Sequence, residues 1–272
     1  IQDINDSLAP YYNGPHCHTS ILVKNKYGLK NLYKLVSLSH TKYFHKVPRV
    51  PKSELERYRD GLLIGSGCEC GELYSAITKG KTFDECCEIA RFYDYIEIVP
   101  IENLKYFIEQ GYADTEDDLK SINEFIIKIA DHASRPAVAV GDVHFLYSDD
   151  GECRKILMHN KGYSDYKNQP ELILKSTKEM IESFSYLDPD KAYEIVVENS
   201  NYLAEEIDNT FEPFPMEMSY PKMDDSDERI TMWSYIGARR KYGKHIPSFV
   251  EERLNWELEK IKENGYADLY LV

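Results

Sequence analysis

The stretch Arg135-Pro-Ala-Val-Ala-Val-Gly-Asp-Val-His-Phe-Leu-Tyr147 contains the features on which the predicted fold and chemistry of this chain depend. A run of small and β-branched residues, 137–140, follows a proline and precedes Gly141, which predicts a buried strand that ends at a turn. Asp142 and His144 come next. In an extended chain, residues i and i+2 point to the same side, so a carboxylate and an imidazole are expected to leave the strand together. Such pairs bind divalent metals, but taken alone this pair favours a hydrogen-bonded loop closure.

The chain on both sides of this stretch alternates between short apolar runs and amphipathic helices. Apolar residues recur with a period near 3.6 in the helical segments, whereas the strands are bounded by turn residues. Strands are predicted at 16–25, with 21–23 as a buried centre, and at 61–65, 94–100 and 137–140. Helices are predicted at 28–39, 72–77, 82–93 and 114–133. A further helix is expected to start after Ser53, which would be its N-cap. The order strand, helix, strand, helix, strand, helix, strand predicts a parallel α/β arrangement.

Helices and one proline-rich segment make up the remainder of the chain. Capping boxes are expected at Thr82 with Glu85 and at Ser176 with Glu179. Further helices are predicted at 1–9, 152–159, 176–184, 188–208, 226–242 and 247–264, and a turn at 13–15. Three prolines within 211–221 indicate an extended linker. We therefore expect one domain over 1–210, a linker over 211–225 and the start of a second domain over 226–272.

Composition and charge restrict the class of protein. The 272 residues carry a net charge of −14 with a pI near 5.1. Such a surface on average repels phosphate backbones, so any action on nucleic acid must depend on a metal or on other parts of a larger protein. The sequence contains no apolar run near the roughly 20 residues of a membrane helix and no secretory signal. The six cysteines include no CxxC pair, which indicates reduced thiols and a cytoplasmic location.

A glycine-rich turn adds a candidate ligand. Residues 66–71 follow a predicted strand and precede a predicted helix, which puts Cys68 and Glu69 at the C-terminal end of the strand. Active sites of α/β barrels form at that end. The turn lacks the Gly-Lys-Ser/Thr ending of a phosphate-binding P-loop.

Two other segments have both a functional and a plain structural interpretation. His16 and His18 are expected to share a face of the first strand, either as ligands or as a polar strand entrance. The basic and aromatic segment 40–51 is either a solvated connector or a contact for a phosphate or another domain.

Long segments of the chain resemble one known family. The matching segments are 21–25, 28–45, 47–51, 61–68, 141–146 and 154–157, together with residues 251–254, 257–259 and 265–266. They resemble the PolC-type alpha subunit of bacterial DNA polymerase III, a family C replicative polymerase, over essentially the whole chain. The resemblance implies the C-terminal portion of a PHP domain, a distorted (β/α)7 barrel, followed by the mainly helical entrance to the polymerase palm.

The resemblance also implies a metal site and a set of partners. PHP sites bind metals through His, Asp, Glu and Cys, and the family pattern places ligands at His18, Cys68, Asp142 and His144, with zinc or manganese as the metal. The parent protein would use magnesium, DNA primer-template and dNTPs, would contact a sliding clamp and other replisome subunits, and would carry a 3′–5′ exonuclease. It would not contact a membrane.

Several of the family's functional residues have no counterpart in this sequence. The palm's catalytic aspartates and the early PHP ligands are absent, so this chain is interpreted as a fragment that binds at most one zinc or manganese ion and does not polymerise DNA alone. The alternative is a free-standing PHP-type phosphoesterase, in which a metal-bound water attacks a phosphate ester. A third interpretation, compatible with the first, is a non-catalytic scaffold.

Overall fold

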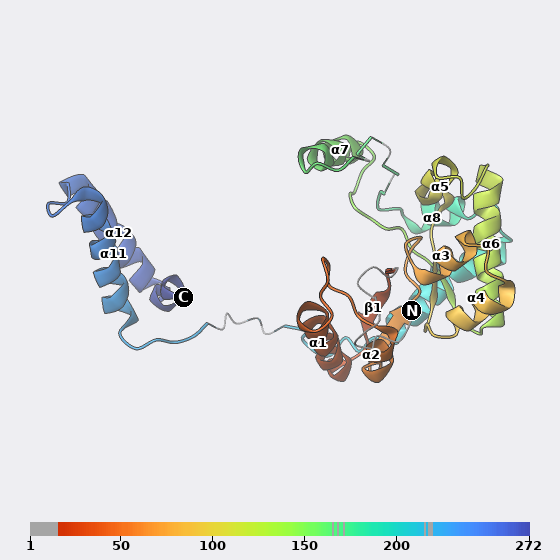
Figure 1. Ribbon diagram of the computed structural model, residues 1–272, viewed down its shortest axis with the longest axis horizontal. Helices are drawn as coiled ribbons and strands as arrows, with labels where there is room; N and C mark the ends of the chain where they lie inside the picture. Colours follow the sequence, from red (N-terminus) through yellow and green to blue (C-terminus); the bar gives the residue numbers. More distant parts are fainter. Residues whose placement is uncertain (1–15, 165, 168, 171, 215, 217–219) are drawn as a thin grey trace. The chain divides into compact units, whose positions relative to one another are not determined.

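A computed structural model describes residues 16–164, 166–167, 169–170, 172–214, 216 and 220–272. The chain forms two compact units, and the division along the sequence falls between Pro213 and Phe214 (Figure 1). This division lies within the proline-rich segment expected to be a linker. The helix predicted at 1–9 and the turn at 13–15 lie outside the described residues.

The first unit contains short strands and many helices in the order that the sequence predicts. Its strands are β1 (Ser20–Val23), β2 (Leu62–Gly65), β3 (Ile96–Ile98) and β4 (Ala137–Ala139). Its helices are α1 (Lys26–Thr41), α2 (Lys52–Arg57), α3 (Glu72–Thr78), α4 (Phe83–Ala90), the 3₁₀ turn η2 (Ile101–Leu104), α5 (Tyr106–Glu109), α6 (Glu116–His132), α7 (Asp150–Asn160), α8 (Thr177–Ser183), α9 (Pro189–Tyr193), the π-helical turn η3 (Glu194–Glu198) and α10 (Asn199–Glu205).

The strands are not all parallel, which corrects the predicted arrangement. β3 and β4 pair in parallel, and a parallel bridge from Gly65 to Tyr95 joins β2 to β3, but β1 and β2 pair antiparallel with Ser20 opposite Gly65. Two helices, α1 and α2, lie between β1 and β2. After α1 and α2 the chain returns to the end of the pair at which β1 finished. The strand β2 therefore starts there and runs antiparallel to β1. Apolar periodicity identifies a strand but does not encode its direction.

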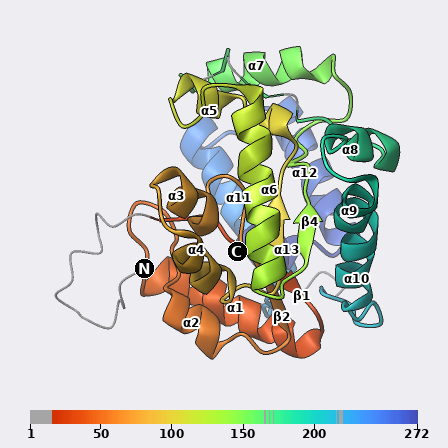
Figure 2. The same ribbon diagram turned by 90° about the vertical axis from the view of Figure 1, so that its right-hand side faces the viewer.

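The core of this unit lies between the strands and α4 and α6. Both predicted capping boxes are present, because Thr82 accepts from the Glu85 amide and Ser176 from the Glu179 amide while each glutamate accepts in return. The helix α6 buries the predicted apolar face, including Leu119, Ile126 and Ile129, and packs against α4, β3 and β4 (Figure 2). The sequence therefore located this layer correctly.

Some local predictions on the first three elements were wrong. The centre of β1, residues 21–23, is half-buried rather than buried, because within the described ranges β1 has a strand partner on one edge only. Val36 belongs to the apolar pattern at 29, 32, 35, 36 and 38 from which a core-facing helix was expected at 28–39, but it is exposed, since α1 turns its Gly28, Asn31, Leu35 and Ser39 face inward. Ser53 is not the N-cap of α2: the helix begins at Lys52, and Pro51 occupies the N-cap position without a side-chain hydrogen bond.

Half-buried and buried polar contacts join the segments that lead into β2 and β3, and join α3 to α6. Arg59 donates to Asp94 and to the carbonyl of Phe92, and Asp94 accepts from the Ile64 amide. In the core, the Tyr74 hydroxyl donates to Asn123 at 3.1 Å. Removing one partner from such a pair leaves a polar group unsatisfied, so these contacts hold together the segments that lead into β2 and β3 and hold α3 against α6.

The second unit is helical. It contains α11 (Ser226–Tyr242), α12 (Ser248–Glu263) and α13 (Ala267–Leu271), and the first two match the helices expected there. Ile230, Leu258 and Ala267 form its small buried core. Asp268 caps the segment before α11 by accepting from the Met223 amide at 3.0 Å.

Candidate metal centre

His18 is held at the entrance to β1 by its backbone. Its amide donates to the carbonyl of Cys70 at 3.0 Å, and it forms a parallel bridge with Gly71. These contacts bring the segment before β1 alongside the turn that follows β2. The imidazole of His18 therefore lies beside the two cysteines of that turn.

Glycines at both ends of the turn permit this close approach. Gly67 has φ +78°, and a Cβ placed there would lie 2.5 Å from the His18 carbonyl oxygen. At Gly71 a Cβ would lie 2.4 Å from the carbonyl oxygen of Ser66. A side chain at Gly67 would push the two segments apart, whereas one at Gly71 would clash with the backbone of the turn itself and open the turn. The role of the glycines is thus to let the His18 segment pack closely against this turn, not to bind a phosphate.

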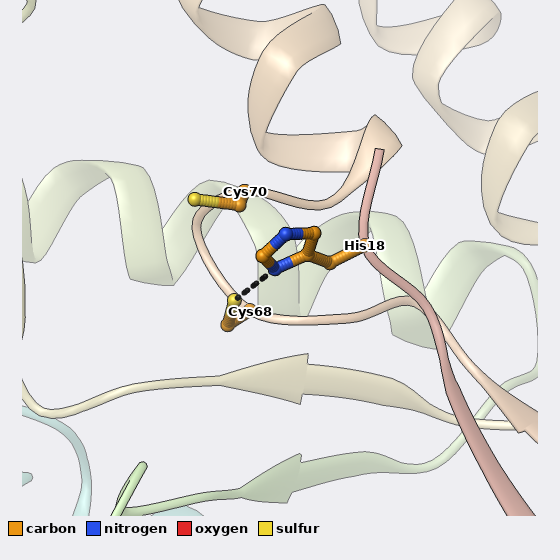
Figure 3. Close-up of side chains that lie close together, drawn as sticks. All are labelled: His18, Cys68 and Cys70. Atoms are coloured by element: carbon orange, nitrogen blue, oxygen red, sulfur yellow. Dashed lines mark hydrogen bonds between the residues drawn. The ribbon is translucent and has the colours of Figure 1, made fainter. Parts of the chain in front are cut away.

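His18, Cys68 and Cys70 form a close group of potential metal ligands. One ligand atom from each lies within 4.8 Å of the other two, and the Cys68 sulfur is 3.8 Å from His18 Nδ1. Figure 3 shows the two cysteine side chains on either side of the imidazole. A tetrahedral zinc ion with usual bond lengths separates a nitrogen and a sulfur ligand by about 3.6 Å. The His–Cys–Cys set therefore fits zinc in both donor chemistry and spacing.

Cys68 and Cys70 affect each other's ionisation. A hydrogen bond between them lowers the pKa of Cys70 and raises the pKa of Cys68, and burial raises the pKa of Cys68 further. Thiolate is the form that ligates metals. The pair therefore presents one thiolate more readily than an isolated cysteine does, and a bound cation would favour loss of the second proton.

Carboxylates surround the thiol pair. Glu69 lies between the two cysteines in sequence, its negative charge raises the pKa of Cys68, and its Oε2 is buried with no hydrogen-bond partner among the described residues. After burial, the same carboxylate is the largest cause that raises the pKa of Tyr106. The negative charge of Asp142 also opposes ionisation of Cys70. A cation at this point would neutralise the concentrated negative charge.

Asp142 and His144 lie close together, as expected, but not for the expected reason. The strand β4 ends at Ala139 and Asp142 has φ +48°, so the chain between them is not extended and the i, i+2 argument fails. The pair stays close because His144 Nδ1 lies 2.7 Å from the carbonyl oxygen of Asp142 and 3.8 Å from its Oδ1. A carbonyl only accepts, so Nδ1 donates to it, and in the neutral imidazole the lone pair is then on Nε2. Neither residue belongs to the close group around His18.

The structure adds Cys70, which the sequence analysis did not select. Of the four predicted ligands, His18 and Cys68 meet, and Cys70 completes their group. The signal was present as a Cys-x-Cys spacing between two glycines, which curls both sulfurs to one side of the turn. Asn103 positions the other two predicted ligands, since its Nδ2 donates to the Gly141 carbonyl at 3.0 Å.

Comparison with known proteins identifies the family. The PHP domain pattern matches residues 6–113, a span that contains all three members of the close group. A DNA polymerase III PolC-type from Clostridium perfringens is 43% identical over 258 residues, which cover 95% of this chain and 18% of that protein. The DNA polymerase III PolC-type from Bacillus subtilis is 42% identical over 276 residues, which cover 99% of this chain and 19% of that protein. This chain belongs to the PolC-type DNA polymerase III family.

Membership in the PolC-type family confirms the resemblance seen in the sequence. The chain spans about a fifth of the length of the curated relatives it matches. It contains a PHP domain and has a mixed α/β fold. Among the described residues, no helix is both long and apolar enough to cross a bilayer.

Proposed function

We propose that this chain is the PHP-containing part of a longer replicative DNA polymerase, a nucleotidyltransferase that extends a DNA primer on a template with dNTPs. The identity of 38–43% to PolC-type polymerases over 95–99% of the chain carries the proposal. In this proposal, magnesium serves polymerisation, the protein works in the cytoplasm, and the parent contacts a sliding clamp and carries a 3′–5′ exonuclease.

The proposed division of labour follows the two compact units. Residues up to 210 would be the C-terminal portion of a distorted (β/α)7 PHP barrel, 211–225 a linker, and 226–272 the start of the palm. The short β3–β4 parallel pair with α6 packed against it supports a β/α organisation. The small helical unit with its own core supports a separate structural role for the C-terminal residues.

The metal centre in this proposal uses His18, Cys68 and Cys70 as ligands to zinc or manganese, with Asp142 and His144 as additional donors from the neighbouring segment. A bound ion would act as a Lewis acid toward a phosphate ester oxygen. The protein's own residues would supply the negative charge that balances the ion: the cysteine pair supplies a thiolate and Glu69 a buried carboxylate. The His144 imidazole is held in place because its Nδ1 donates to the Asp142 carbonyl.

A second function, metal-dependent phosphoester hydrolysis, is favoured by one observation. His18 and Cys70 are exposed and Cys68 is half-buried, so the three-ligand group faces solvent and leaves a coordination position open to substrate. A structural zinc site would instead have four protein ligands and a closed geometry.

Primer extension by the parent polypeptide tests the first function. We expect extension by the parent, none by this chain alone, and retention of extension after the double substitution Asp142→Asn with His144→Ala. Extension by the chain alone, or none by the parent, would contradict the proposal. Phosphate release from a nucleotide ester by the chain with zinc or manganese, abolished by Cys70→Ser, would establish the second function.

A further inference from the structure

One segment of this acidic chain is rich in basic residues and contains no acidic ones. Residues 24–52 contain eight of the chain's 33 Lys and Arg residues and none of its 47 Asp and Glu residues. Most of this segment is α1 and the loop that follows it. In Figure 1, α1 lies at the opposite side of the first unit from α4 and α6. Lys24 and Lys52, at its two ends, form ion pairs with Glu206 and Glu72. The stretch between them, 26–49, contains the other six cations and is an electropositive surface on a strongly acidic chain.

Three lysines form a row along the outward face of α1. Lys26, Lys30 and Lys34 are four residues apart and all exposed, whereas the opposite face is buried. Successive ammonium groups are thus about one turn, or 6 Å, apart along the helix. Within the described part of the chain, none of the three forms an ion pair with a carboxylate, and Lys34 instead lies 5.1 Å from the ring centre of Tyr58. We call these three residues the lysine row.

The position of the lysine row works against the stability of α1. A helix N-terminus already carries partial positive charge, so acidic residues are favoured in the first turn. The helices α4 and α6 follow this rule, with acidic first turns at 84–85 and 116–118, whereas α1 has no acidic residue in its first turn and begins with Lys26. Three unpaired ammonium groups on the positive half of a helix therefore repel one another and the dipole. A bound polyanion would offset this repulsion.

Aromatic rings alternate with these lysines. Tyr27 is 60% exposed and Tyr33 is 47% exposed on the same face of α1, and Phe44, beyond its C-terminal end, is 52% exposed. A row of phosphate-binding cations interleaved with exposed rings is the pattern by which proteins hold single-stranded nucleic acid, because the unpaired bases stack on the rings. In a duplex the base faces are stacked on one another and cannot stack on these rings. An acidic peptide would pair with the lysines but has no bases to stack on the rings.

We propose that the outward face of α1, with the lysine row and the rings of Tyr27, Tyr33 and Phe44, binds single-stranded DNA through its phosphates and its unpaired bases. This site is separate from the His18, Cys68 and Cys70 group. The choice of DNA over other single-stranded nucleic acid rests on the proposed polymerase function. The lysines supply the salt-dependent part of the affinity and the rings supply the base-dependent part.

Anisotropy of a labelled oligothymidylate with this 272-residue chain tests the lysine row. The charge-reversed variant is Lys26→Glu, Lys30→Glu and Lys34→Glu, and its matched control is Lys105→Glu, Lys128→Glu and Lys178→Glu, three exposed lysines elsewhere in the first unit. At about 0.1 M salt we expect at least a tenfold loss of affinity for the first variant and less than a twofold loss for the control. Three lost phosphate contacts should also reduce the slope of log K against log salt by about 2.

Equal losses in the two variants, or no loss in the first, would overturn the proposal. A second variant, in which glutamine replaces all three lysines of the row, separates loss of charge from misfolding because it adds no carboxylates. It should show a similar loss of affinity for oligothymidylate. Circular dichroism of each variant verifies that α1 is retained.

The rings are tested with an abasic oligomer of the same length. We expect the chain to bind oligothymidylate more tightly than the abasic oligomer, and Tyr27→Leu with Phe44→Leu to abolish the difference without changing the salt slope. Equal binding of both oligomers by the unaltered chain would overturn the stacking role. Polyglutamate that binds the lysine row as tightly as oligothymidylate would instead assign the surface to an acidic protein partner.

Primer extension by the parent distinguishes failure of this inference from failure of the proposed function. The parent protein could extend primers while the lysine-row variant of this chain keeps its affinity for oligothymidylate. That pair of results would overturn only the DNA-binding inference. A parent that does not extend primers overturns the polymerase proposal, whatever the binding result.

Discussion

A methyl group at Gly67 would lie 2.5 Å from the carbonyl oxygen of His18. The backbone φ of +78° at this position is also strained for any residue that has a Cβ atom. Gly80 has a similar φ, +72°, but nothing lies within 4 Å of its missing Cβ. We expect Gly80→Ala to cost about 1–2 kcal/mol from the left-handed backbone alone. Gly67→Ala should cost a further 1–3 kcal/mol or so from crowding and should also weaken metal binding.

Urea unfolding of the two glycine variants, followed by zinc titration of each, measures both effects. The comparison isolates the close contact because the backbone conformation is matched. Zinc affinity that stays unchanged in Gly67→Ala would show that the turn does not position the ligands.

Cys70 is the residue that decides whether the metal centre has two ligands or three. Because protein-bound zinc needs at least three protein donors, we expect Cys70→Ser to reduce zinc affinity at least tenfold. Cys153→Ser, at an exposed cysteine on α7, is the matched control and should bind like the unaltered chain. Competition with a chromophoric chelator gives the affinities, and calorimetry should count one ion per chain. Unchanged affinity in Cys70→Ser would remove Cys70 from the site.

At the scale of the element, capping boxes give the structure its best-defined helix starts. The Thr82 side chain accepts from the Glu85 amide and the Glu85 carboxylate accepts from the Thr82 amide at 2.9 Å. Loss of such a cap typically costs about 1 kcal/mol, so Thr82→Ala should destabilise the first unit by roughly that amount. Chemical denaturation at neutral pH measures the change. Ser53→Ala is the control without a capping role, and an equal loss there would contradict the assignment.

The same capping box makes stability depend on pH. The hydrogen bond from the Thr82 amide, with Lys81 nearby, lowers the pKa of Glu85 from 4.5 to about 2. A carboxyl group with a lowered pKa stabilises the fold above its unfolded pKa, and this contribution is lost as the pH falls from 4.5 toward 2. We expect Glu85→Gln to lower the melting temperature at pH 7 and to reduce the acid sensitivity over this window. Parallel melting curves of both proteins across the range would contradict this.

The helices were predictable from sequence because their signals are local. The apolar face of α6 and the Thr82–Glu85 box each lie within a few turns of chain. The antiparallel pairing of β1 with β2 was not predictable in this way, because strand direction depends on how α1 and α2 pack rather than on periodicity. The π-helical turn at 194–198 likewise has no signal in the apolar pattern.

The candidate site was predictable in part for the same reason. His18 and Cys68 came from the family resemblance, whereas Cys70 required the three-dimensional path of the turn between Gly67 and Gly71. The placement of Asp142 depended on an extended chain, and the positive φ at that residue could not be inferred from alternation alone.

At the scale of the whole molecule, the two compact units have separate buried cores. Ile126 belongs to the large core of the first unit and Ile230 to the small core of the second. Both are buried, and Ile→Ala at such positions costs about 2–5 kcal/mol. Because neither core includes residues of the other unit, we expect each substitution to destabilise its own unit and leave the other nearly unchanged.

The positions of the two tryptophans make this expectation measurable. Both of the chain's tryptophans, Trp233 and Trp256, lie in the second unit, on α11 and α12, so their fluorescence reports that unit alone, whereas circular dichroism reports the helices of both. In urea, the tryptophan transition should precede the larger part of the dichroism change, because the second unit has the smaller core. Ile230→Ala should shift the tryptophan transition to lower urea, and Ile126→Ala should shift only the remaining dichroism transition. Coincident transitions that both substitutions shift equally would show that the two units unfold as one cooperative structure.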